Sequence, residues 1–132
     1  MPIAITEDHQ ALGRTTSEFL TKRDARGAAR ALLEAKEEAL PPFWDELAGL
    51  GWLGLHLPED VGGSGFGLPE LVVVVEELGR AVAPGPFVPT VIASALLDDS
   101  ASDELKGRLL PGLADGLMFQ YRSASFGFTS SM

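Results

Sequence analysis

The sequence contains no cysteine and only two histidines. Without cysteine, neither a disulfide bond nor a thiolate metal site can form. His9 and His56 lie far apart in the sequence, and neither has a second ligand at the spacing of a metal site. We therefore expect no bound metal.

Basic residues are also scarce, because 10 lysines and arginines stand against 19 aspartates and glutamates, for a formal net charge of -9. A chain of this charge repels a phosphate backbone unless its few cations gather on one face. Nucleic acid is therefore a disfavoured partner.

Long hydrophobic runs are absent as well. The longest aliphatic run, residues 71–75, is far shorter than the about 20 residues that a membrane-spanning helix needs. The first residues, "MPIAITEDHQ", are acidic and lack the apolar core of a secretion signal. We expect a cytoplasmic protein with no membrane span.

Helical periodicity dominates the rest of the sequence. The 132 residues, 45% of them hydrophobic, suit one domain with one core. Apolar residues recur at intervals of three and four along most of the chain, which predicts an all-α bundle of about five or six helices with an irregular C-terminal tail. We expect helices at residues 6–24, 26–40, 42–50, 69–82, 90–97 and 102–116, the second being either separate or a kinked continuation of the first.

Capping and pairing residues support several of these helices. Thr6 and Ser102 are suited to cap the first and last helices. Gly51 is well placed as the left-handed residue that closes the third. Glu76 precedes Arg80 by one turn, so these two side chains are expected to pair.

Two segments show the alternation of extended structure instead. Leu53, Leu55 and Leu57 occupy alternate positions, so we predict an extended piece that ends at Pro58. In the tail, residues 117–132, aromatic side chains alternate as they do in a strand, although the sequence offers no partner strand.

Four of the six residues from 62 to 67 are glycine, which raises the question of a phosphate-binding loop. Gly62 and Gly67 have the P-loop spacing, but Leu68 and Pro69 stand where the lysine and the hydroxyl residue belong. A dinucleotide motif would need a glycine at position 68 and a long strand before it. We interpret the segment as a turn between two helices.

The segment "GLHLPEDVGGSGFGLPELVVVVEELGRAVAPGPF" resembles the N-terminal helical domain of the acyl-CoA dehydrogenase family. The flanking pieces "FWDELAGLGWLGL" and "LLPGLADG" are similar to family segments in the same order. The resemblance covers roughly residues 6–116. It implies an N-terminal-like helical domain over residues 1–116, with the tail, residues 117–132, in place of the start of a β domain.

In this family FAD oxidises an acyl-CoA thioester between its α and β carbons, a glutamate acting as the base. The N-terminal domain supplies part of the wall around the acyl chain. The resemblance therefore implies an acyl-pocket wall on the helix after "APGP", formed by Phe87, Thr90, Val91 and Ser94. For Thr90 and Ser94 the alternative is that they only pack against a neighbouring backbone.

The departures from the family are equally informative. No residue of this chain matches the flavin-binding motif or the catalytic base, and we interpret Glu76 and Glu77 as a solvated or ion-paired face. We expect a truncated or frame-disturbed N-terminal domain that is inactive and binds no FAD by itself. The alternatives are a small helical interaction module that pairs with a full-length dehydrogenase subunit, and an unrelated acidic helical protein.

Overall fold

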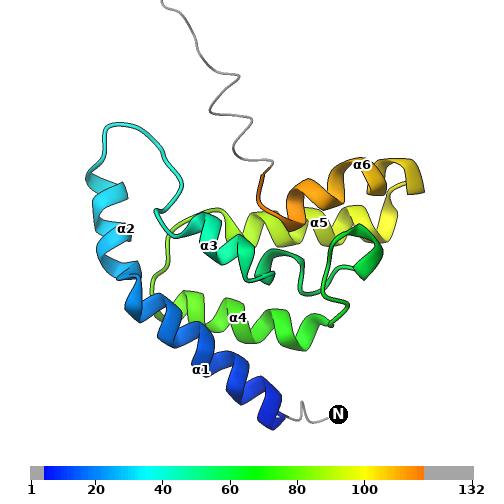
Figure 1. Ribbon diagram of the computed structural model, residues 1–132. Helices are drawn as coiled ribbons and strands as arrows, with labels where there is room; N and C mark the ends of the chain where they lie inside the picture. Colours follow the sequence, from blue (N-terminus) through cyan, green and yellow to red (C-terminus); the bar gives the residue numbers. More distant parts are fainter. Residues whose placement is uncertain (1–4, 118–132) are drawn as a thin grey trace, which may run out of the picture.

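The computed structural model describes residues 5–117, which form six α-helices and two short 3-10 helices and contain no strand (Figure 1). The all-α prediction is therefore confirmed. The α-helices are α1 (Glu7–Lys22), α2 (Ala25–Glu34), α3 (Trp44–Gly49), α4 (Leu68–Arg80), α5 (Phe87–Ser100) and α6 (Asp103–Ala114), and the 3-10 helices are η1 (Trp52–Gly54) and η2 (Glu59–Val61).

Helix α1 packs along α4, and the starts of the two helices are joined by side chains (Figure 1). As predicted, Thr6 caps α1, its Oγ1 accepting a hydrogen bond from the His9 amide at 3.2 Å. The His9 ring accepts from the Thr6 amide through Nδ1 and reaches Glu70 Oε1 with Nε2, at 3.2 Å. Glu70 Oε2 in turn accepts from the Gly67 amide at the start of α4. One histidine and one carboxylate thus fix two helix starts together.

The corner between α1 and α2 lies at Asp24. This residue adopts a left-handed conformation, with φ of 49°, and its carboxylate accepts from the Gly27 amide at 3.2 Å. Because the backbone turns here, the second helix is a separate element and not a continuation of the first.

Helix α2 is shorter than predicted, since it ends at Glu34 and residues 35–40 are not helical. In water, residues with high helix propensity form only marginally stable helices by themselves. A stable helix also needs a face that is buried against the rest of the protein. Leu33 near the end of α2 is 87% exposed, so further turns would gain no burial. In Figure 1, α2 stands apart from α5 and α6.

The extended piece predicted at residues 53–57 is wrong, because η1 and a tight turn occupy this stretch. Leu53, Leu55 and Leu57 are all buried, and so is Gly54 between them. A turn enclosed by helices can bury neighbouring residues on every side, so their alternate spacing was not evidence of a strand. Gly51 is left-handed as predicted, with φ of 80°.

Two clusters of apolar side chains form the core. The larger one joins α1, the start of α2, α3, η1, α4 and α5, and the partly buried Phe19 packs against it, meeting Trp52 edge to face with ring centroids 5.3 Å apart. The smaller one seats α6 on the turn after η1 through Leu57, Leu110 and Leu113. Helix α5 lies between α6 and the larger cluster, so both clusters help to position it (Figure 1).

The connection from α4 to α5 contains a strained residue. Val82 has a φ of 51°, in the left-handed region that β-branched residues avoid. Its amide donates to the Gly79 carbonyl, and the Ala83 amide donates to the Leu78 carbonyl at 2.9 Å. This is the helix-ending pattern in which glycine is the usual central residue, so valine occupies a glycine position here.

Among residues 5–117 no helix is long and apolar enough to cross a membrane, and no cluster of three potential metal ligands occurs there. The strand-like alternation predicted for residues 117–132 lies, apart from Leu117, outside the described residues.

Candidate functional site

The glycine-rich turn is closed by its own hydrogen bonds. The backbone amides of residues 62–66 each donate to a backbone carbonyl of residues 54–59, at distances from 2.9 to 3.1 Å. The Gly67 amide donates to the Glu70 carboxylate at 3.0 Å. A phosphate-binding loop presents such amides to its ligand. Since all six amides are engaged, this loop has none to offer a phosphate.

One glycine of the turn is required by close packing. A Cβ atom at Gly63 would lie 2.1 Å from the Leu57 carbonyl oxygen, closer than any side chain can approach a backbone. Gly62 and Gly65 have positive φ values of 87° and 70°. These glycines therefore serve the turn, which agrees with the interpretation drawn from the sequence.

The four predicted pocket residues lie together on one side of α5. Phe87, Thr90, Val91 and Ser94 are 4%, 2%, 4% and 0% exposed, and they face the protein interior. Thr90 Oγ1 donates to the Pro86 carbonyl, and Ser94 Oγ donates to the Val91 carbonyl at 3.0 Å. Both hydroxyls thus bond to the backbone of their own helix or its cap. We call these four residues the inner face of α5, and their role as an acyl-pocket wall stays a prediction.

The opposite side of α5 lies outside the four predicted residues. Val88, Ile92 and Leu96 are 42%, 54% and 63% exposed. Together with the exposed Pro89, Ala93 and Ala95 they form a surface without a polar side chain, which we call the outer face of α5. The signal was present in the sequence, because no charged residue occurs from position 87 to position 97.

The inner face meets one side chain from another part of the chain through a polar contact. His56, in the turn after η1, is partly buried and places Nε2 3.0 Å from Ser94 Oγ. Burial lowers the pKa of His56, while a hydrogen bond with the Val91 backbone and the charge of Asp98 act in the opposite direction. Within the described residues, the buried Nδ1 atom of His56 has no hydrogen-bond partner.

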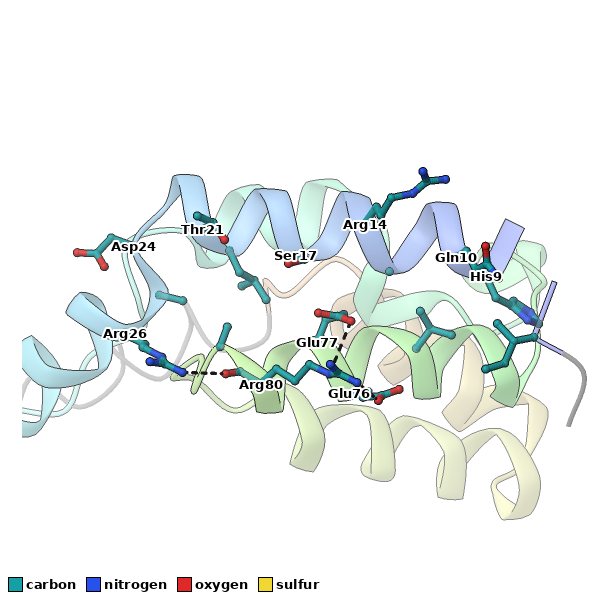
Figure 2. Close-up of a pocket in the computed structure, with 16 residues that line it drawn as sticks. His9, Gln10, Arg14, Ser17, Thr21, Asp24, Arg26, Glu76, Glu77 and Arg80 are labelled. Carbon is teal, nitrogen blue, oxygen red and sulfur yellow. Dashed lines mark hydrogen bonds and ion pairs between the residues drawn. The ribbon is translucent and has the colours of Figure 1, made fainter. Parts of the chain in front are cut away.

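A groove with a volume of about 870 Å³ lies between α1 and α4, and we call it the α1–α4 groove (Figure 2). Figure 2 shows Ser17 of α1 on the side that faces α4, whereas Arg14 points away. The predicted pair is confirmed, with Arg80 Nη2 2.6 Å from Glu76 Oε1. The charged side chains that line the groove balance one another: Arg14, Arg26 and Arg80 against Asp24, Glu76 and Glu77.

A smaller groove of about 370 Å³ lies where α4 ends and α5 begins, and we call it the α4–α5 groove. No charged residue lines it. Its lining includes Phe87 of the predicted residues, the strained Val82, and Val88 of the outer face. Of the four predicted residues, Phe87 alone lines one of these two grooves, and the structure brings the four together on one helix face.

Comparison with known proteins identifies this helical arrangement. The family model described as "Acyl-CoA dehydrogenase, N-terminal domain" matches residues 6–117. The chain belongs to the acyl-CoA dehydrogenase family. The match contains every helix of the structure, together with the glycine-rich turn and both faces of α5.

Three similar proteins place the chain within that family. Acyl-CoA dehydrogenase FadE34 of Mycobacterium tuberculosis is 32% identical over 106 residues, which cover 74% of this chain and 15% of FadE34. Acyl-CoA dehydrogenase IpdE2 of Mycolicibacterium smegmatis is 33% identical over 104 residues, covering 77% and 33%. A solved structure, a variant of the Tcur3481-Tcur3483 steroid ACAD, matches with a TM-score of 0.74 and 36% identity over 86% of this chain and 31% of that one. The chain therefore spans about a third or less of each protein.

Acyl-CoA dehydrogenases use FAD, so the fit of this chain to a flavin can be tested. The flavin's phosphates would need free amides or cations, and the glycine-rich turn has every amide of residues 62–67 engaged. In the α1–α4 groove Arg80 is paired with Glu76 and Glu77, and Arg26 donates to the Arg80 carbonyl. The glycine-rich turn therefore does not fit the phosphates of the flavin.

Proposed function

We propose that this chain is the N-terminal helical domain of an FAD-dependent acyl-CoA dehydrogenase that oxidises acyl-CoA thioesters between the α and β carbons. In that enzyme the domain would contribute one wall of the acyl pocket, and the remaining domains would contribute the flavin and the catalytic base. By itself the chain would bind no FAD and turn over no acyl-CoA.

The outer face of α5 is the observation that carries this proposal. Val88, Ile92 and Leu96 follow one another at intervals of four residues, and all three are more than two-fifths exposed. A contiguous apolar patch on a soluble domain usually marks a surface that another molecule or domain covers. An acyl chain, which has no polar group of its own, suits a wall of this composition.

The four residues predicted from the sequence all belong to the helix that we propose as the wall. Helix α5 as a whole is the wall, and Phe87, Thr90, Val91 and Ser94 form its inner side. Phe87 also lines the uncharged α4–α5 groove, so it is the one of the four that is best placed to meet an acyl group.

A direct test begins with the purified chain. We expect no flavin absorbance and no reduction of an electron acceptor when acyl-CoA thioesters of several chain lengths are added. Stoichiometric bound FAD together with acyl-CoA-dependent turnover would contradict the proposal that the chain is inactive alone.

A chimera tests the wall itself. Residues 6–117 would replace the corresponding domain of the Tcur3481-Tcur3483 steroid ACAD, and we expect a flavin-containing enzyme with an altered acyl-CoA preference. In the chimera, Phe87→Leu should change the KM for acyl-CoA, whereas Leu33→Ala on the distant α2 should not. If a flavin-loaded, active chimera responds to neither substitution, α5 is not part of the wall.

The outer face also favours a second candidate, an interaction module that pairs with a full-length dehydrogenase subunit. In that case the tagged chain should retain a flavin-containing dehydrogenase from the native lysate, and Ile92→Lys should abolish the retention. Gel filtration gives the contrary outcome: a stable monomer that retains no flavoprotein argues against pairing.

A further inference from the structure

Helix α5 buries its more polar side and exposes its more apolar one. The inner face contains two hydroxyl residues, Thr90 and Ser94, whereas the outer face is apolar from Val88 to Leu96. Apolar burial is roughly proportional to area and has no direction. If α5 were rotated about its own axis, Val88, Ile92 and Leu96 would face the interior and would also bury apolar area. Apolar burial alone therefore does not determine which face of α5 packs inward.

The two buried hydroxyls differ in what they can specify. Thr90 Oγ1 bonds to Pro86 at the start of the same helix, so this bond holds whichever way α5 faces. Ser94 Oγ also lies 3.0 Å from His56 Nε2, across 38 positions of the sequence. The contact with Ser94 is therefore a hydrogen bond that depends on how α5 is turned.

Ser94 Oγ lies 3.0 Å from both the Val91 carbonyl oxygen and His56 Nε2, and its single hydrogen can be donated to only one of them. We assign that hydrogen to the Val91 carbonyl, so that the Ser94 oxygen accepts from the ring. His56 Nε2 accordingly carries the ring hydrogen and donates it. The other nitrogen, Nδ1, then has a lone pair, and it is buried without a partner in the described part of the chain.

We infer that His56 is a positioning residue which, through Ser94, selects the face of α5 that packs inward and hence the face that is presented outward. Single buried polar contacts are known to fix the register of helices whose apolar surfaces would allow several packings. The inference concerns this chain's own packing and goes beyond its proposed part in a dehydrogenase.

The same geometry makes the selection sensitive to pH. Protonation of His56 would place a hydrogen on the buried Nδ1, which has no acceptor, and would put a charge in a partly desolvated site. Of the elements that pack around the ring, α5 contributes the charge that acts on it, that of Asp98, one turn beyond Ser94. Asp98 favours the charged ring, but the opposing effect of burial is larger.

Cysteine labelling can test the inference, because the chain has no cysteine of its own. Val91→Cys would place a thiol on the inner face and Ile92→Cys a thiol on the outer face. In the otherwise unchanged chain, the outer thiol should react with a soluble maleimide much faster than the inner one. Adding Ser94→Ala should raise the inner-to-outer rate ratio by roughly two- to tenfold, the range expected for the loss of one hydrogen bond.

The pH profile distinguishes positioning from simple packing. In mildly acidic solution both thiols lie below their pKa values, so their thiolate fractions change by the same factor with pH and the rate ratio isolates α5. This ratio should rise as the solution is acidified through the pKa of His56. His56→Gln keeps a side-chain N–H that can reach Ser94 and does not titrate, so it should give a low ratio at every pH. His56→Leu should give a high ratio at every pH.

Two results would overturn the inference. One is an unchanged inner-to-outer ratio in the Ser94→Ala and His56→Leu chains, each shown by circular dichroism to remain helical. The other is the same pH response with His56→Gln as with histidine. If Ser94→Ala does not fold, the comparison of His56→Leu with His56→Gln decides the matter. None of these measurements involves flavin or acyl-CoA, so their failure leaves the proposed function intact.

Discussion

Helices α4 and α5 follow one another along the chain, yet they differ in how polar and apolar residues are distributed between their buried and exposed sides. Helix α4 buries Leu71, Val74 and Leu78 and turns the Glu76–Arg80 pair to solvent, so its sequence pattern states which side is inside. Helix α5 exposes apolar residues on its outer side as well, so its sequence pattern does not state which side is inside. Helix α4 thus has a polar outer side, whereas the outer side of α5 is apolar, which is what the proposed wall of an acyl pocket requires.

The largest expected effect compares the same substitution in the two helices. Leu78→Ala in α4 removes a 7% exposed side chain and should lower the free energy of unfolding by about 2–5 kcal/mol. Leu96→Ala in α5, at 63% exposure, should change it by less than about 0.5 kcal/mol. Urea denaturation measures both. Equal losses would mean that the outer face of α5 is part of this chain's own core.

The junction of the two helices offers an effect of opposite sign. Val82→Gly removes a β-branched residue from the left-handed conformation at the end of α4, so we expect it to stabilise the chain by about 1 kcal/mol. The matched control is Val72→Gly inside α4, at similar exposure, which should destabilise by about 1 kcal/mol. Thermal denaturation compares the two. A loss of stability with Val82→Gly would refute the strain at this junction.

The third prediction concerns the pH dependence of α5. Burial lowers the pKa of His56 below the value of 6.5 that it has in the unfolded chain. The unfolded state therefore binds this proton first as the pH falls, and the free energy of unfolding decreases from pH 6.5 down to the folded-state pKa. Above pH 6.5 His56 is neutral in both states, so it causes no loss of stability there.

Urea denaturation between about pH 7.5 and about pH 5 measures this effect. The difference between the unchanged chain and His56→Gln should shift towards lower stability of the former as the solution becomes acidic. A difference that does not vary with pH would show that the ring is charged equally easily in both states.

The smallest expected effect sharpens the contrast between the outer sides of the two helices. Ile92→Lys places a charged side chain on the outer side of α5. Because the site is exposed, the free energy of unfolding should change by less than about 0.5 kcal/mol. Retention on a hydrophobic-interaction column should fall clearly. Arg80→Ala on α4 serves as the control and should not lower the retention.

What the sequence predicted correctly depended on information held within single elements. The cap at Thr6 and the ion pair of Glu76 with Arg80 involve residues one turn apart, so local pattern was sufficient. The end of α2 at Glu34 depends on the absence of burial beyond it, which helix propensity does not report. The compact turn around Leu55 depends on the helices that enclose it.

For the candidate site, too, local pattern was predictable from the sequence and tertiary packing was not. The four residues Phe87, Thr90, Val91 and Ser94 were predicted from a family resemblance, and the structure gathers them on one face of α5. Which face would be inward was beyond the sequence, since no charged residue occurs from position 87 to position 97. The contact that carries the further inference joins His56 to Ser94 across 38 positions, and no periodicity connects them.

The packing of Gly63 against the Leu57 carbonyl has a consequence for how genomes are interpreted. Closely spaced glycines before a helix raise the question of a nucleotide site, whereas here Gly63 is required because two stretches of backbone touch. In other chains with this turn, glycine should be the least replaceable residue at the position of Gly63. Preservation of that one glycine would then indicate an inherited fold, and would not show whether a chain catalyses a reaction.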